Sequence, residues 1–82
     1  MLENNIAVER EKIVHRALIE FESALIGYAA SIVKDEDRAK DVVQDTFIKL
    51  YEQDPEKVKE SLKAWLFTVC RNRCFDVIRK EK

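Results

Sequence analysis

Apolar residues recur at helical spacing along most of the chain, and the first such pattern covers its N-terminal third. Between Ile6 and Val33 only Gly27 weakens a helix, and the inward positions advance alternately by four and three residues. We expect one helix of up to 28 residues there, with residues 1–5 frayed. The absent side chain of Gly27 would let another helix approach closely. The packing stripe is Val14, Leu18, Phe21, Leu25, Tyr28 and Ile32.

A second helix is predicted after the charged stretch KDEDR. Asp35 suits its N-cap, because a carboxylate there accepts from free backbone N–H groups, and the acids at 36 and 37 complement the helix dipole. Pro55 lacks an N–H and disfavours helical geometry in the preceding residue, so the helix should end near Gln53. Its inward band is Ala39, Val42, Val43, Thr46, Phe47, Leu50 and Tyr51.

The segment DPEKVKES has the composition of an exposed connection with room for one helical turn. Ser61 can cap the third helix that follows, and Trp65 flanks the apolar stripe of that helix. Three stripes around one core predict an all-α, compact three-helix bundle with a long first helix, a single domain over residues 1–82. The third stripe is Leu62, Leu66, Val69, Cys70, Cys74, Val77 and Ile78.

Composition supports this architecture and adds a separation of charge along the chain. One glycine and one proline in 82 residues argue against tight hairpins, and a charged fraction of 38% requires highly charged outer faces. Residues 1–61 hold nine Lys/Arg and fourteen Asp/Glu, whereas residues 62–82 hold six and two. The C-terminal helix can therefore attract an anion although the whole chain is mildly acidic.

The chain carries no recognisable pattern for catalysis, metal binding or membrane insertion. Cys70 and Cys74 lie four residues apart in one helix, where side chains project in parallel, so we expect reduced core thiols. The single His15 has no neighbouring acid, nucleophile or second metal ligand at a known spacing, and no glycine-rich phosphate loop is present. We therefore predict neither enzyme activity nor a cofactor. Without a signal peptide or an apolar run of about 20 residues, we expect a cytoplasmic protein with no membrane partner.

The polar side of the third helix resembles a nucleic-acid surface, although a merely solvated helix has the same composition more often. Its arginines can contact phosphates, Asn72 and Thr68 can hydrogen-bond base edges or sugar, and Phe75 or Trp65 could stack on a base. For Trp65 we favour core packing. Asp76 shares a helix face with Lys80, and we expect these two to pair.

Two linked motifs identify a family. The stretch DVVQDTFIKLY resembles D-x-V-Q-[DE]-x-F-x-x-x-[YW], and WLFTVCRNRCFDVIRK resembles W-L-x-x-[IV]-x-R-N-x-x-x-D-x-x-R. In this order they resemble region 2 of bacterial sigma factors, specifically the extracytoplasmic-function (ECF) group, over about residues 18–82. This resemblance implies a transcription initiation module without catalytic activity of its own.

The resemblance also implies partners and site residues. The second helix would dock on the clamp helices of the largest RNA polymerase subunit through Arg38, Asp41, Gln44, Asp45, Lys49 and Glu52. The third helix and the preceding loop would bind the non-template strand of the minus-ten promoter element, with one base flipped into a pocket. The DNA-binding residues would be Lys57, Lys59, Ser61, Lys63, Thr68, Arg71, Asn72, Arg79 and Lys80, with Arg73 a less favoured candidate. An anti-sigma factor would be a further partner.

Two departures from the family pattern and one alternative remain open. ECF sigma factors carry a second helical domain that reads the minus-thirty-five element, and we expect no such domain within residues 1–82. The family also opens with a short separate helix and a glycine-containing turn, whereas here we expect one continuous first helix. The alternative function is a helical protein-interaction module that dimerises through the apolar stripe of that first helix.

Overall fold

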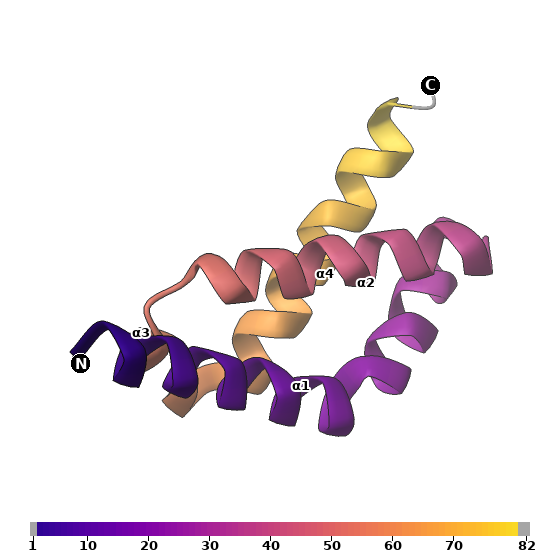
Figure 1. The fold of residues 1–82 in the computed structure, drawn as a ribbon. Coiled ribbons are helices and arrows are strands. Elements are labelled where there is room, and N and C mark those ends of the chain that lie inside the picture. Colours follow the sequence, from indigo (N-terminus) through magenta and orange to yellow (C-terminus); the bar gives the residue numbers. More distant parts are fainter. Residues whose placement is uncertain (1, 81–82) are drawn as a thin grey trace.

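The computed structural model describes residues 2–80, with side chains for residues 8–54 and 56–80, and this part of the chain folds as a bundle of helices. Figure 1 shows α1 and α2 running side by side in opposite directions, with α4 crossing behind them. The prediction of an all-α three-helix bundle with a long first helix is confirmed. The elements in order are α1 (Leu2–Val33), α2 (Glu36–Glu52), α3 (Pro55–Val58), the 3₁₀ turn η1 (Lys59–Ser61) and α4 (Leu62–Lys80).

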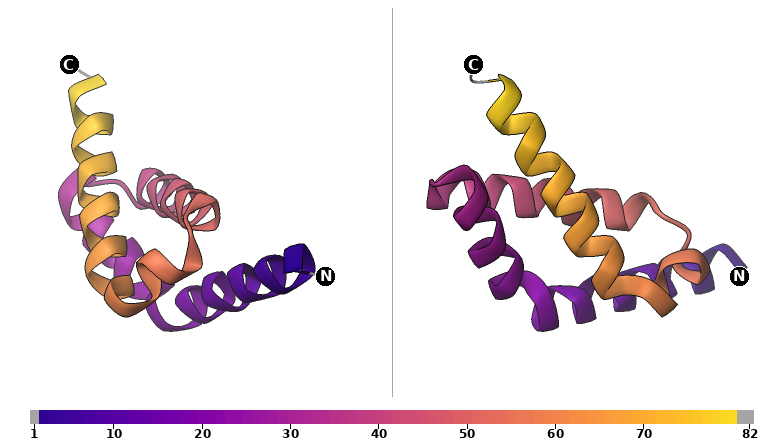
Figure 2. Two further views of the ribbon diagram at one scale, coloured as in Figure 1. Left: turned by 90° about the vertical axis from the view of Figure 1, so that its left-hand side faces the viewer. Right: turned by 180° about the vertical axis from the view of Figure 1, so that it is seen from behind.

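The first helix is continuous, as predicted, but longer and bent. It begins at Leu2 and extends over 32 residues to Val33. Met1 lies outside the described residues, and the fraying of residues 1–5 stays a prediction. Two further views show that α1 bends near its middle, and that its second half leads up to the start of α2 (Figure 2). One helix thus contacts both other long helices, as helices that curve around a core do.

The proposed packing role of Gly27 is wrong. Gly27 is exposed, and a Cβ added there would meet no other atom within 4 Å. The inward positions nearby are Leu25 and Ala29, both fully buried, so that the intervening glycine points to solvent.

The core draws on every helix. In α2, six of the seven predicted residues are buried, and Thr46 meets its hydrogen-bonding need by donating from Oγ1 to the Val42 carbonyl at 2.9 Å. Tyr51 is the exception, because it is 45% exposed and its ring lies 5.7 Å below the guanidinium carbon of Arg10. The buried apolar residues are Ala17, Leu25, Ala29, Ala39, Val42, Val43, Phe47, Leu50, Val58, Leu66, Cys70 and Cys74.

In α1 the predicted stripe packs on this core, but two of the most buried positions are alanines outside the stripe. Ala17 and Ala29 are fully buried together with Leu25. The other five predicted stripe residues are half-buried against the core: Val14, Leu18, Phe21, Tyr28 and Ile32. The stripe thus contributes to the chain's own core, and the alternative of dimerisation through it stays a prediction.

In α4 the thiols are core groups, as predicted. Cys70 and Cys74 are free and buried, and the Cys70 thiol lies 4.0 Å from the Leu25 carbonyl oxygen, toward which it donates. Burial raises the pKa of Cys70 to about 12 and also raises the pKa of Cys74, so both stay protonated and poorly nucleophilic at neutral pH. Trp65 packs against the same core, which confirms its favoured interpretation.

The connections follow local capping chemistry with one correction. Asp35 caps α2 by accepting from the Arg38 backbone N–H at 3.1 Å, and α2 ends at Glu52, both as predicted. The predicted cap at Ser61 is wrong, because Ser61 belongs to η1, which continues directly into α4. The preceding 3₁₀ turn, rather than a capping side chain, therefore leads into the first turn of α4.

The connection between α2 and α4 is held to the bundle by one apolar side chain. It contains the single helical turn α3, in which the Asp54 carboxylate accepts from the Glu56 N–H at 3.0 Å. Val58 is only 4% exposed and joins the hydrophobic core. Polar residues on either side of Val58 are thereby presented to solvent from a fixed segment.

None of the helices that the structure describes has both the length and the apolar character of a bilayer-spanning segment.

Candidate functional site

The outer side of α2 carries the first predicted surface. Five of its six predicted residues are exposed and follow one another at intervals of three to five positions, whereas Asp45 is half-buried. The Nε of Arg38 also lies 3.8 Å from the carboxylate of Asp35, the N-cap residue of α2. The structure thus presents Arg38, Asp41, Gln44, Lys49 and Glu52 to solvent along one helix.

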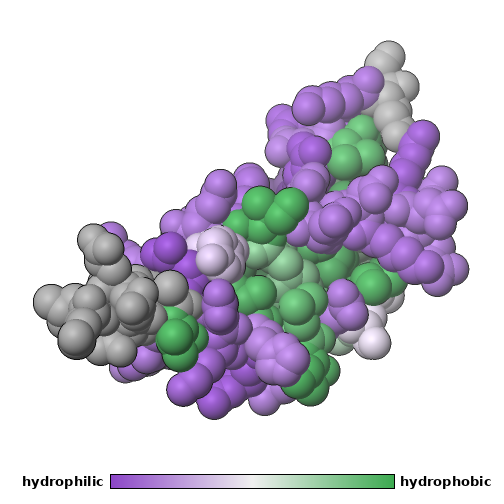
Figure 3. Space-filling view, viewed as in Figure 1, coloured by the Kyte–Doolittle hydropathy of each residue, from purple (hydrophilic) through white to green (hydrophobic). Residues whose placement is uncertain are grey.

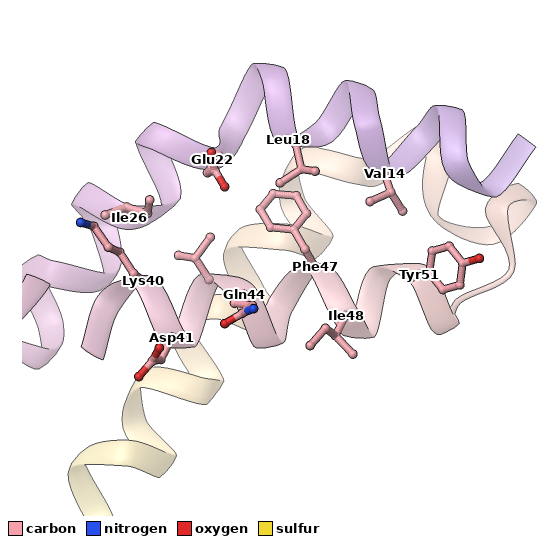
Figure 4. Close-up of a pocket in the computed structure, with 11 residues that line it drawn as sticks. Val14, Leu18, Glu22, Ile26, Lys40, Asp41, Gln44, Phe47, Ile48 and Tyr51 are labelled. Carbon is pink, nitrogen blue, oxygen red and sulfur yellow. The ribbon is translucent and has the colours of Figure 1, made fainter. Parts of the chain in front are cut away.

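An exposed isoleucine completes this surface. Ile48 is 53% exposed and follows Asp41 and Gln44 at positions i+7 and i+4, so it lies among the polar residues of α2. Figure 4 shows these three side chains following one another along the helix, while Phe47 points toward Leu18 of α1. The sequence carries a signal for this residue, since Ile48 is an apolar residue outside the inward band of its helix.

An apolar groove adjoins this face between α1 and α2. Its volume is about 660 Å³, and the space-filling view shows apolar side chains gathered there between polar margins (Figure 3). Glu22, Lys40, Asp41 and Gln44 contribute polar groups to its lining. The α2 face therefore combines acids, an amide and apolar surface. The apolar lining consists of Val14, Leu18, Ile26, Val43, Phe47, Ile48 and Tyr51.

One predicted member of the α2 face is instead engaged within the protein. The Asp45 carboxylate accepts a hydrogen bond from Arg73 Nε of α4 at 3.0 Å, with 41% and 30% of the two side chains exposed. The pair lines a notch of about 220 Å³ where α2 and α4 diverge. It joins two helices far apart in sequence, and nothing in the sequence pattern indicated that these two residues meet.

The outer side of α4 carries the second predicted surface. Its predicted residues Thr68, Arg71, Asn72, Arg79 and Lys80 are all exposed and follow helical spacing. In all three views, the C-terminal half of α4 projects beyond the other helices (Figures 1 and 2).

Phe75 lies on this basic face, between the positions of Asn72 and Arg79. It is 47% exposed and lines a shallow groove of about 460 Å³ with Asn72, Asp76, Ile78 and Arg79. The predicted pairing of Asp76 with Lys80 is wrong, because Asp76 accepts a hydrogen bond from Arg79 instead. The guanidinium group of Arg79, three residues after Asp76, has several N–H donors in a planar arrangement that suits a carboxylate.

The connection before α4 and the first turn of α4 contribute the remaining predicted residues. Lys57, Lys59 and Ser61 of the connection are exposed, and so is Lys63 in α4. Lys59 donates to the Glu56 carboxylate at 3.1 Å, and this hydrogen bond is the main reason why the pKa of Lys59 is raised. Part of its charge is thus already compensated within the connection.

A third groove lies beside this connection. It has a volume of about 550 Å³ and is lined by residues 60–64 and by Phe67. The Phe67 ring is half-buried and meets the ring of Tyr28 edge-on, with 5.3 Å between centroids. The groove therefore has a fixed aromatic wall, and Phe67 is a residue that the sequence pattern had not singled out.

In the part of the chain described here, no cluster of three His, Cys, Asp or Glu side chains could hold a metal ion.

Comparison with known proteins finds one family whose match covers both faces. Residues 18–82 match the family described as Sigma-70 region 2. The chain is 35% identical over 80 residues to the ECF RNA polymerase sigma factor SigL of Mycobacterium tuberculosis. This match covers 93% of this chain and 45% of SigL. It is 36% identical over 55 residues to the ECF RNA polymerase sigma factor SigM of Bacillus subtilis, with 67% and 34% covered. The chain thus spans less than half the length of these relatives, and no solved structure matches it significantly.

Proposed function

The chain belongs to the Sigma-70 region 2 family, as a region 2 domain of an ECF sigma factor, and from this premise we propose that it directs RNA polymerase to promoters. The observation that supports the proposal most is the separation of the two motifs onto two faces. One motif exposes acids and apolar surface on α2, and the other exposes arginines and an amide on α4. Because α2 and α4 share one core, a partner on each face would be held in a fixed relation to the other.

In the first half of the proposal, the α2 face binds the clamp helices of the largest polymerase subunit. Asp41 and Glu52 would meet basic groups, which fixes register and speeds encounter. Ile48 and the adjoining groove would supply the desolvated centre that protein interfaces need within a polar rim. The polar residues alone would give a weaker interface, so we add Ile48 to the predicted set.

In the second half, the α4 face and the connection bind the minus-ten element as it melts. Arg71, Arg79, Lys63 and Lys80 would contact phosphates of the non-template strand, and Thr68 and Asn72 would read bases. The groove beside Ser61 and Phe67 has the position and the aromatic wall that a flipped base would need, although unstacking that base costs a few kcal/mol. Phe75, exposed on the same face, adds apolar surface for a base or sugar.

The proposal extends to the cellular setting of the domain. It would act in the cytoplasm with RNA polymerase, without catalysing a reaction itself, and an anti-sigma factor would compete for one of its faces. Such competition would require no conformational change, since both proposed faces are exposed.

The DNA half is tested by binding to single-stranded DNA of mixed sequence across a salt series. Affinity should fall steeply with salt, because each phosphate contact contributes about −0.7 to the logarithmic slope for single strands. Replacing Arg71 and Arg79 together by alanine should lower affinity about tenfold and reduce the slope by about 1.4. Arg16, exposed on α1, provides the control, and its replacement by alanine should change neither quantity appreciably.

The opposite result would remove the basic helix from the mechanism. Wild-type affinity that does not respond to salt, or an Arg71→Ala, Arg79→Ala variant that binds as tightly as Arg16→Ala, would contradict the DNA half of the proposal.

A further inference from the structure

We infer that the Asp45–Arg73 ion pair is a tether that holds the DNA-binding half of α4 at its angle to α2. Asp45 is then a positioning residue for DNA binding, a role that its place on the polar face of α2 does not suggest. This inference rests on the proposed function of α4 as a DNA surface.

The tether lies where α4 leaves the core. Cys74 is the last fully buried residue of α4, and the later apolar residues Val77 and Ile78 are only half-buried. Arg73 immediately precedes Cys74, so its contact with Asp45 lies at the end of the fully buried part of α4. The C-terminal part of the helix projects beyond the other helices (Figure 2, right). A small rotation at this point would displace the end of the helix by a larger distance.

The surroundings of the pair favour a structural role over direct phosphate binding by Arg73. The notch that holds it is also lined by Val42 and Val77, with Arg38 and Asp41 at its polar edge. Arg73 is 30% exposed, compared with 75% for Arg79, and its Nε is already engaged at 3.0 Å. Two carboxylates and two guanidinium groups line this notch, so it has little net charge with which to attract a phosphate.

Electrostatics alone and the proposed tether predict opposite effects on DNA affinity when the Asp45 carboxylate is removed. Removing a carboxylate near a DNA surface should, by electrostatics alone, raise affinity for DNA. If Asp45 positions α4, its removal lowers the fraction of molecules with α4 correctly placed, and apparent affinity falls in proportion. We expect Asp45→Asn and Arg73→Gln each to weaken binding of mixed-sequence single-stranded DNA three- to fivefold, about 0.7–1 kcal/mol by the relation of 1.4 kcal/mol per tenfold.

A charge swap and a matched control separate positioning from other effects. The double variant Asp45→Arg, Arg73→Asp restores the pair with its polarity reversed and should bind DNA within twofold of wild type. Glu36→Gln removes an acid from the same helix, where it pairs with Lys40 at 3.9 Å, and should leave DNA affinity within twofold. Hydrogen exchange should accelerate at the amides of residues 75–80 in Asp45→Asn and not in Glu36→Gln.

The outcomes distinguish this inference from the function on which it rests. If Asp45→Asn binds DNA as tightly as wild type or more tightly, or if the charge swap binds no better than the single variants, the tether is refuted while the DNA surface stands. If wild type itself shows no salt-dependent DNA binding, the proposed function fails first, and the exchange measurement then decides whether the pair still orders the end of α4.

Discussion

Replacing Leu66 by alanine is expected to lower the free energy of unfolding by about 3 kcal/mol. Leu66 is fully buried on α4, a helix that packs against both α1 and α2, and truncation of such a leucine typically costs about 2–5 kcal/mol. The loss combines the transfer energy of the deleted carbons with that of the cavity left behind. A domain of this length has only about 4–12 kcal/mol of total stability, so the melting temperature should fall by roughly 12–24 °C.

Urea denaturation followed by circular dichroism measures this change. Ile19 is the matched control, because it is an aliphatic residue in a long helix but is 72% exposed. Ile19→Ala should change the free energy of unfolding by no more than about 0.5 kcal/mol. Equal losses in the two variants would mean that α4 does not pack as described.

Replacing Asp41 and Gln44 together by alanine is expected to weaken binding to the polymerase clamp helices about thirtyfold. Both side chains are exposed, and they flank the groove that continues the α2 face. Truncation of a residue central to an interface commonly costs more than about 1 kcal/mol, and two such losses amount to about 2 kcal/mol, or thirtyfold. Asp45 is left intact because it contacts Arg73, so that its replacement would change the position of α4 as well as the docking surface.

Isothermal titration of a purified clamp-helix fragment into each variant measures the loss. Glu36→Ala serves as the control, since Glu36 is an exposed acid of α2 outside the predicted docking set. Circular dichroism should show both variants folded, because neither position contributes to the core. A double variant that binds as tightly as Glu36→Ala would contradict docking through the α2 face.

The sequence predicted the helices well because their signals are local. The cap at Asp35, the end of α2 before Pro55 and the buried band of α2 each depend on residues within one or two turns. One error has a local cause as well. Tyr51 satisfies helical periodicity but lies at the edge of its band, where solvent reaches its ring.

The features that the sequence did not reveal depend on contacts between distant segments. Ala17 and Ala29 are among the most buried residues of α1, yet they are too small to stand out in a hydrophobic pattern, and only close helix packing makes them important. Likewise, Asp45 and Arg73 are 28 residues apart, and their pairing depends on the angle at which α4 crosses α2. Periodicity places a residue on a face of a helix, but it does not say which helix that face will meet.

For the candidate site, the resemblance supplied the residues and the structure supplied their surroundings. The predicted positions on α2 and α4 are exposed, with Asp45 the half-buried exception. The structure added Ile48 and Phe67, and it showed that Lys59 and Arg79 already have acidic neighbours, Glu56 and Asp76. Arg71 and Asn72, both exposed on α4, stay candidates for contacting DNA.

Selection from a randomised pool of single-stranded DNA, with the chain bound to a bacterial RNA polymerase core, tests the central claim most directly. The account predicts that one short common motif is enriched, that enrichment requires both the chain and the polymerase core, and that Asn72→Ala weakens or alters the motif. Recovery of sequences with no common motif, or of the same sequences by the polymerase core without the chain, would contradict the account.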